Sequence, residues 1–315
     1  MIPYIEKVFG PPGCGKTTYL ASVIEKSGIP ITDIAAVSFS KTASGRIYDK
    51  VASLGYSDDD LEFFRTLHSI NFRMLNLKKD QVVTRRRLRE FSKNHHILFS
   101  EQFLKDEDSD PSIAREYTDI REGSPDDFIT SYERARNHNT PTIIPAHLKG
   151  HARRYAEFVR TYQQWMIQND LYDFTRMIEE GIRRSLVPPV RLLCVDEAQD
   201  FTPLQYSQLD VWVQRSQSIE KMYLVGDPDQ AIFCWAGAEP DLFMDFPCTK
   251  KRYLDITYRL PPNILAFSQA IIGKNIKRER FGVVSAIKND GVFYKPHSFS
   301  QVARLIKDTI MKGDR

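Results

Sequence analysis

Residues 10–18 constrain the fold of this chain more than any other feature, because they read GPPGCGKTT. The spacing G-x-x-x-x-G-K-T places Gly10, Gly15, Lys16 and Thr17 in the register of a phosphate-binding loop, or P-loop. The preceding YIEKVF predicts a short strand, and the following TTYLASVIEKSG has helical apolar spacing and a glycine stop. A glycine-rich turn that happens to precede a lysine is the alternative, and the flanking strand and helix disfavour it.

The residue types of this loop suit a nucleotide. Glycines let backbone N–H groups turn inward around phosphate, and the N-terminus of the following helix favours negative charge. We expect Lys16 to neutralise the β- and γ-phosphates and the Thr17 hydroxyl to bind Mg²⁺. The residues predicted to hold the nucleotide are Gly10, Pro11, Pro12, Gly13, Cys14, Gly15, Lys16, Thr17 and Thr18.

A second stretch, LLCVDEAQDF at 192–201, supplies two adjacent acids where an apolar run ends. At the carboxyl end of a parallel strand, Asp196 is placed to contact the metal, and Glu197 can accept the proton of the attacking water. Alternatively, the two acids are simply the solvated end of a strand without a function, and the presence of a P-loop disfavours that interpretation. Together the two stretches predict a site that hydrolyses a nucleoside triphosphate.

The totals set broad limits on the chain. A length of 315 residues suggests two or three domains, and 42% hydrophobic with 27% charged residues is typical of a soluble globular protein. The net charge of +3 says little about partners. The four cysteines are scattered without a CxxC pair, which favours a reduced cytosolic protein over a disulfide framework or a zinc site. No apolar stretch has membrane-spanning length and no secretory signal follows Met1, so we expect a cytoplasmic location.

The sequence around the acids separates the many kinds of P-loop protein. VDEAQDFTPLQ (195–205) is followed by YLVGDPDQAIFCWAGA (223–238) and LDITYRLPPNI (254–264). This set resembles the UvrD/Rep/PcrA family of superfamily 1 DNA helicases. GPPGCGKT is similar to motif I of that family, VSFSKTAS (37–44) to motif Ia and TLHSI (66–70) to motif Ib. VDEAQD is similar to motif II, GDPDQAIFCWAGA to motif III and TYR to motif IV, all in the order of the family.

The resemblance implies further roles at the nucleotide. Gln230 would touch the γ-phosphate or the water and report the nucleotide state to the DNA side. Arg259 would reach the γ-phosphate from a second domain, as an arginine finger does, and Tyr258 would stack on the adenine. A glutamine in a turn after a strand can also simply cap the backbone, and that alternative for Gln230 remains open.

Single-stranded DNA is bound by aromatic faces for the bases and by hydroxyls or basic groups for the phosphates. The aromatic candidates for stacking are Phe39, Phe233 and Trp235, and the polar candidates for backbone contact are Ser38, Ser40, Thr66 and His68. Any of these aromatics can instead belong to a core, and His68 can be a structural histidine. We favour Trp235 as the stacking residue.

Short apolar runs alternate with helical patterns, which predicts an α/β fold with a parallel sheet, helices on both faces and ligands at the carboxyl ends of the strands. By resemblance, 1–72 and 186–255 form a RecA-like P-loop NTPase motor domain, 1A. Residues 73–185 form an inserted helical subdomain, 1B, and 256–315 begin a second RecA-like domain, 2A. Basic groups within 78–93 and 149–160 suit either a phosphate-contacting face or a solvated helix surface.

The match to the family is incomplete at three places. No glutamine precedes Gly10, and the position that is often arginine after GKT is Thr18, so selectivity for ATP is less secure. The W-R-G-A of motif III reads WAGA at 235–238 and lacks the arginine. Motifs V and VI have no counterpart before Arg315, and motif VI usually supplies a second arginine to the γ-phosphate.

The sequence therefore predicts an ATP-dependent DNA helicase or translocase of the UvrD type, acting in DNA repair or replication. It would use ATP and Mg²⁺ and bind single-stranded DNA or a single-strand/duplex junction, moving 3′ to 5′ by resemblance. Without motifs V and VI we expect ATP binding, weak hydrolysis and little unwinding by this chain alone. The alternatives are a nucleotide-switched DNA-binding regulatory module without motor activity, and a P-loop kinase, in which Gln230 and the TYR motif have no obvious place.

Overall fold

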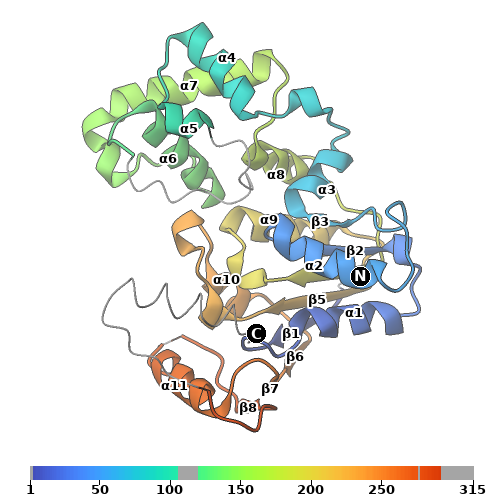
Figure 1. The fold of residues 1–315 in the computed structure, drawn as a ribbon. Helices are drawn as coiled ribbons and strands as arrows, with labels where there is room; N and C mark the ends of the chain where they lie inside the picture. The colour runs from blue at the N-terminus through green and yellow to red at the C-terminus, as the bar shows by residue number, and fades with distance from the viewer. Residues whose placement is uncertain (1–2, 106–119, 276, 292–315) are drawn as a thin grey trace, which may run out of the picture.

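A parallel sheet of six strands forms the centre of the computed structural model, which describes residues 3–105, 120–275 and 277–291 (Figure 1). The strand order is β3-β2-β4-β5-β1-β6, and each neighbouring pair is parallel. The strands are β1 (Tyr4–Phe9), β2 (Ile34–Ser38), β3 (Phe64–Thr66), β4 (Leu192–Asp196), β5 (Lys221–Gly226) and β6 (Lys250–Tyr253).

Both faces of the sheet are covered, as the apolar composition of its central strands requires. One face packs against α1 (Lys16–Lys26) and α2 (Lys41–Ala52), with side chains such as Leu20 and Ile47 in the core. The other face packs against α3 (Leu67–Met74), α8 (Phe174–Arg183), α9 (Pro203–Arg215) and α10 (Pro240–Asp245). The predicted α/β class, with helices on both faces of a parallel sheet, is confirmed.

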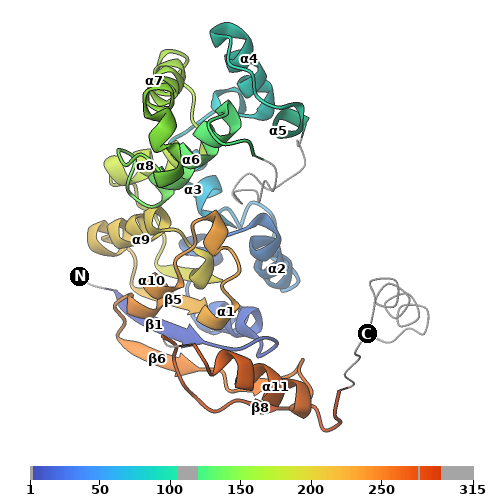
Figure 2. The same ribbon diagram turned by 90° about the vertical axis from the view of Figure 1, so that its left-hand side faces the viewer.

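The chain between α3 and β4 is helical and has a core of its own. Its helices are α4 (Arg85–His95), α5 (Glu101–Lys105), α6 (Pro125–Asn137) and α7 (Ala152–Gln168), followed by α8. In both views α4 to α7 lie to one side of the sheet, beyond α8 and α9 (Figures 1 and 2). Their core is aromatic: Phe91 is fully buried, and its ring centroid lies 4.9 Å from that of Trp165 and 5.5 Å from that of Tyr162.

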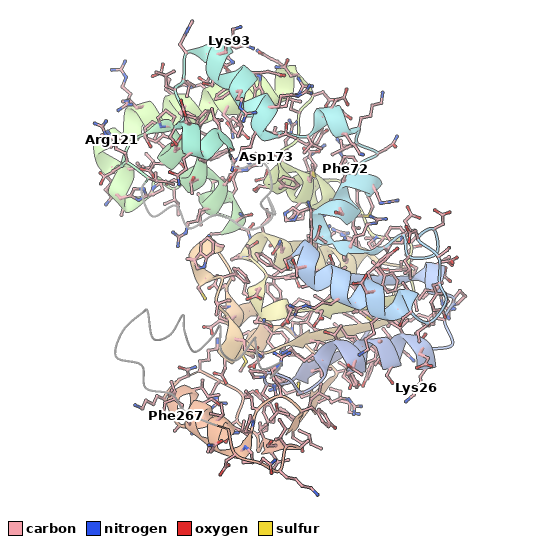
Figure 3. All side chains as sticks on the ribbon, in the orientation of Figure 1. Lys26, Phe72, Lys93, Arg121, Asp173 and Phe267 are labelled. Carbon is pink, nitrogen blue, oxygen red and sulfur yellow. The ribbon has the colours of Figure 1, made fainter. Side chains whose placement is uncertain are left out.

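A buried ion network joins this helical region to α8. Arg136 on α6 donates to both carboxylate oxygens of Asp173, at 2.7 and 3.1 Å, and to Glu179 on α8 at 2.6 and 2.8 Å. Asp173 also caps α8 by accepting from the Arg176 N–H at 2.7 Å, and Figure 3 shows where it lies between the two helices. The Arg136 guanidinium lowers the pKa of Asp173 against the effect of burial.

The last described part of the chain lies on the opposite side of the sheet from α4 to α7 (Figures 1 and 2). It contains β7 (Ile256–Thr257), β8 (Val284–Ser285) and α11 (Pro262–Ile272), and the two strands form a small parallel sheet. The part of the predicted segment 256–315 from residue 292 onward lies outside the described residues, as do 106–119 within 73–185. No helix in the described ranges is long and apolar enough to cross a membrane.

Candidate active site

The glycine loop connects β1 to α1 at the carboxyl edge of the sheet. Gly13 and Gly15 have φ of 73° and 83°, in the left-handed region where a side chain would be strained. The Lys16 ammonium folds back over the loop and donates to the Gly10 carbonyl at 3.0 Å. Lys16 is buried, and α1 begins at this residue, so its ammonium and the first N–H groups of the helix lie at one place. That arrangement suits a phosphate group.

The two acids stand at the end of β4, directly beside the loop. Asp196 is only 2% exposed, and its carboxylate accepts from the Thr17 hydroxyl at 3.1 Å and from the Glu197 N–H at 3.0 Å. Burial, and then the charge of Glu197, raises the pKa of Asp196 to about 6, against the opposing effects of Lys16 and Thr17. Glu197 has a φ of 51°, which turns the chain sharply as it leaves the strand. The Lys16 ammonium therefore offsets only part of the cost of burying the Asp196 charge beside Glu197.

Thr17 and Asp196 are the residues that could hold Mg²⁺. Their oxygens are hard ligands already within 3.1 Å of each other, and Mg²⁺ in nucleotide sites takes one or two protein oxygens and completes its shell with phosphates and water. Within the described ranges, no group of three or more His, Cys, Asp or Glu side chains could hold a metal ion. The donor set therefore fits a metal that arrives with a nucleotide.

The turn after β4 makes a contact with the turn after β5 that sequence reasoning missed. The Gln199 amide donates to Glu197 at 3.1 Å and to Asp200 at 3.2 Å, and its oxygen accepts from the Asp227 N–H at 2.9 Å. Burial and the charge of Glu197 raise the pKa of Asp200 to about 7. Gln199 lies only two residues after Glu197 in the sequence, but the function of a lone glutamine cannot be read from its type, and the contact forms because β4 and β5 are neighbours.

Gln230 lies in the same region, with its side chain engaged in the turn. Its amide donates to the Asp227 carboxylate, and its N–H donates to the Asp227 carbonyl at 3.0 Å. Burial raises the pKa of Asp227, and the bond from Gln230 opposes that rise. The Gln230 side chain thus bonds to a neighbouring carboxylate in this structure, and its contact with the γ-phosphate stays a prediction.

The TYR segment lies directly on the glycine loop. The Thr257 hydroxyl donates to the Pro12 carbonyl at 2.7 Å, and the Tyr258 N–H donates to the Gly13 carbonyl at 3.0 Å. A Cβ on Gly13 would lie 2.2 Å from the Cβ of Arg259, so only glycine permits this close approach. The segment therefore brings Arg259 next to the loop, and it leaves the Tyr258 side chain 65% exposed.

The three aromatic candidates for DNA stacking form a row. The Phe233 ring centroid lies 5.2 Å from that of Phe39 and 6.2 Å from that of Trp235. Phe39 is 3% exposed and packs in the core beside the sheet, so no face of its ring is open to a base in this structure. Phe233 and Trp235 are half-buried and retain accessible surface.

The four polar candidates for DNA contact lie at the ends of β2 and β3. The Ser40 hydroxyl caps α2 by accepting from the Ala43 N–H at 3.1 Å, and Thr66 caps α3. Ser38 and His68 are buried, and the His68 ring meets the Phe174 ring edge-on at 5.5 Å. All four lie on the carboxyl side of the sheet, but the helix caps occupy two of the hydroxyls.

A serine, histidine and aspartate cluster in the helical region does not form a catalytic relay. The Ser131 hydroxyl donates to Asp127 at 3.1 Å, and His147 lies 3.0 Å from that same carboxylate oxygen. The single nitrogen Nε2 of His147 faces both partners, whereas a relay needs opposite ring nitrogens. This cluster ties α6 to the turn Ala146–His151.

Comparison with known proteins gives matches along most of the chain. The family model of the UvrD/REP helicase N-terminal domain matches residues 6–251. An ATP-dependent DNA helicase PcrA of Staphylococcus epidermidis is 24% identical over 326 residues, which cover 96% of this chain and 43% of that protein. A probable DNA helicase of Mycoplasma pneumoniae is 24% identical over 306 residues, covering 89% of this chain and 55% of the relative. This chain therefore spans about half the length of the curated relatives it matches.

Proposed function

This chain belongs to the UvrD/REP helicase family, and from that premise we propose that it is an ATP-dependent DNA translocase or helicase. It binds Mg·ATP at the glycine loop and single-stranded DNA, or a single-strand/duplex junction, at the carboxyl side of the sheet. ATP hydrolysis moves the protein along the bound strand in the 3′ to 5′ direction. On its own, this chain hydrolyses ATP weakly and unwinds little DNA.

One observation carries the proposal: the contact between the Thr17 hydroxyl and the Asp196 carboxylate at 3.1 Å. It joins the first turn of the helix after the glycine loop to the end of β4, two segments about 180 residues apart in the sequence. Lys16 on the loop and Glu197 next to Asp196 complete a set that suits phosphoryl transfer to water.

Each side chain has a distinct task in the reaction. Lys16 and the N–H groups at the start of α1 bind the β- and γ-phosphates. Glu197 takes a proton from the attacking water, whose oxygen bonds to the γ-phosphorus as the bond to the ADP oxygen breaks. Thr17 and Asp196 would hold Mg²⁺, which would supply positive charge to the phosphate oxygens.

The residues that sense and close the site come from neighbouring turns. Gln230 exchanges its contact with Asp227 for the γ-phosphate or the water, and Arg259 stabilises the charge that develops on the transferred group. Tyr258 stacks on the adenine; its high exposure on the surface of the TYR segment supports this role. The remaining loop residues, from Gly10 to Thr18, surround the phosphates.

DNA binding rests on the aromatic row and on the polar strand ends. Trp235 and Phe233 stack with bases. Phe39 packs against Phe233 from the core side, and it stacks with a base only when Phe233 moves away from it. Ser38, Ser40, Thr66 and His68 contact the DNA backbone. We assign 1–72 with 186–255 to the motor domain, 73–185 to the helical subdomain and 256–315 to the start of the second motor domain.

A binding experiment tests this function. The affinity for a fluorescent single-stranded oligonucleotide is measured by anisotropy, with and without Mg²⁺ and a non-hydrolysable ATP analogue. We expect the analogue to change the DNA affinity of the wild type and to leave that of Lys16→Ala unchanged, because linkage between two sites is reciprocal. Failure to bind DNA, or the same analogue effect in both proteins, would contradict the proposal.

A further inference from the structure

We propose that Gln199 is the positioning residue of the hydrolysis site: it orients the Glu197 carboxylate and connects it to the turn that carries Gln230. The inference rests on the proposed function, because it requires Glu197 to act as the base. It goes further by giving a task to a side chain that touches neither phosphate nor metal in the proposed site. The task follows from how the Gln199 amide is held.

Both ends of the amide are engaged, and only one orientation satisfies them. Gln199 is 2% exposed and lies in the short turn Ala198–Asp200. Its nitrogen faces the carboxylates of Glu197 and Asp200, and its oxygen faces the N–H of Asp227. A reversed amide would turn its oxygen toward two carboxylates and its nitrogen toward an N–H group. The network therefore defines which end points at the base.

The surrounding backbone is shaped to admit this side chain. A Cβ on Gly226 would lie 2.7 Å from the Gln199 amide oxygen and 3.3 Å from the Gln199 backbone nitrogen. Glycine at the end of β5 thus lets the amide reach the Asp227 N–H. On the other side, the Tyr206 hydroxyl on α9 donates to the Ala198 carbonyl at 2.8 Å, which fixes the turn against the buried helix.

A glutamine is the residue type that this position requires. Its amide is neutral, so it can hold Glu197 without neutralising it, as a lysine would, or repelling it, as another acid would. Within the described residues, no other side chain is seen to donate to the Glu197 carboxylate. Since Glu197 stands in a left-handed conformation at a sharp turn, this one bond sets where its carboxylate points.

The same amide continues into a chain of contacts toward the second turn. Gln199 accepts from the backbone of Asp227, and the Asp227 carboxylate accepts from Gln230. A movement of Gln230 toward the nucleotide would release the Asp227 carboxylate. The resulting shift of Asp227 would change the position of the Gln199 amide, and through it that of the Glu197 carboxylate. Gln199 is thus the physical link between the proposed sensor and the proposed base.

The test uses single-turnover hydrolysis of ATP with the full chain in excess, in the presence of single-stranded DNA. Gln199→Met keeps the length of the side chain and removes all three hydrogen bonds. We expect the rate to fall about 10²-fold, the cost of a base misplaced by roughly 1 Å, while the affinity for a fluorescent ATP analogue changes less than about threefold. The matched control is Gln205→Met, which removes another buried glutamine of the same segment, one that caps α9 and contacts no acid of the site.

Two further measurements separate positioning from a merely structural role. Because Gln199 acts through Glu197, adding Gln199→Met to Glu197→Gln should cost no further rate, whereas independent effects would multiply. Gln199→Glu retains the oxygen that accepts from Asp227, loses the donor to Glu197 and places a third carboxyl group beside Glu197 and Asp200, so it also removes the bond if the methionine variant does not fold. We expect it to be at least as slow as Gln199→Met.

The outcomes distinguish this inference from the proposed function. The inference alone would be overturned if the wild type hydrolyses ATP faster than Glu197→Gln while Gln199→Met keeps the wild-type rate. A loss that multiplies with Glu197→Gln, or one that Gln205→Met shares, would also overturn it. A wild type no faster than Glu197→Gln would overturn the proposed function and this inference with it.

Discussion

Thr257 holds the TYR segment on the glycine loop, and replacing it with valine should release that segment. The Thr257 side chain is buried, and its hydroxyl donates to the Pro12 carbonyl at 2.7 Å. The same oxygen accepts from the N–H groups of Arg259 and Leu260 at 3.3 and 3.4 Å, which are long and weak bonds. Valine has nearly the same shape and none of these contacts.

The size of the effect follows from the lost hydrogen bond. A buried carbonyl left without a donor costs about 1–3 kcal/mol, and since the Pro12 contact is only partly buried we take the lower part of that range, about 1–2 kcal/mol. At 1.36 kcal/mol for each tenfold change, the docked segment becomes about 5- to 30-fold less populated relative to the open form. Thr257→Ser keeps the hydroxyl and loses one methyl group, so it serves as the matched control.

Hydrogen exchange measures this opening directly. The Tyr258 N–H donates to the Gly13 carbonyl, so its exchange reports the docked state. We expect Thr257→Val to speed exchange in 254–260 by about 5- to 30-fold, because exchange follows the population of the open form. ATP hydrolysis follows the docked population and should fall by a smaller factor through Arg259. Strand β4 should exchange as in the wild type. Equal exchange in the valine and serine variants would refute the hydrogen-bond argument.

Three further predictions follow from buried charges and from the aromatic row. Because burial raises the pKa of Asp196 from 3.8 to about 6, its proton favours the folded state; this contribution, up to about 3 kcal/mol, is complete below pH ~4 and is lost as pH rises through 6. Urea unfolding without Mg²⁺ should therefore show a smaller decline in stability over that range for Asp196→Asn than for the wild type; parallel curves would argue against it. Arg136→Met leaves Asp173 buried without its partner and should lower the free energy of unfolding by about 3–5 kcal/mol, whereas the exposed Arg134→Met should change it by less than about 0.5 kcal/mol. Trp235→Ala should weaken single-stranded DNA binding by about 1–3 kcal/mol in an anisotropy titration, and an unchanged affinity would remove Trp235 from the DNA site.

The sheet and the glycine loop could be predicted from the sequence because both leave local signals. A P-loop needs glycines at fixed spacing between a strand and a helix, and buried parallel strands need continuous apolar runs such as LLCV at 192–195. The acids at the end of β4 were placed correctly because parallel strands present their carboxyl ends at one edge. These inferences depend on residues close together in the chain.

The contacts that sequence reasoning missed depend on residues far apart in the chain. Nothing local shows that Gln199 reaches the backbone of Asp227, since this contact exists only because β4 and β5 are neighbours. Phe39 could be proposed for stacking from its type and position, but its burial is decided by Phe233 and the helices around it. Likewise, Ser40 and Thr66 carry hydroxyls suited to phosphate, and the helices that start beside them use those hydroxyls as caps.

The most direct test of the account is the rate of Mg·ATP hydrolysis by this chain, with and without single-stranded DNA and with Glu197→Gln as the blank. The account predicts a weak rate that exceeds that of the Glu197→Gln blank and rises when DNA is added. A rate that equals the blank under both conditions, despite ATP binding, would contradict it and favour a nucleotide-switched DNA-binding module.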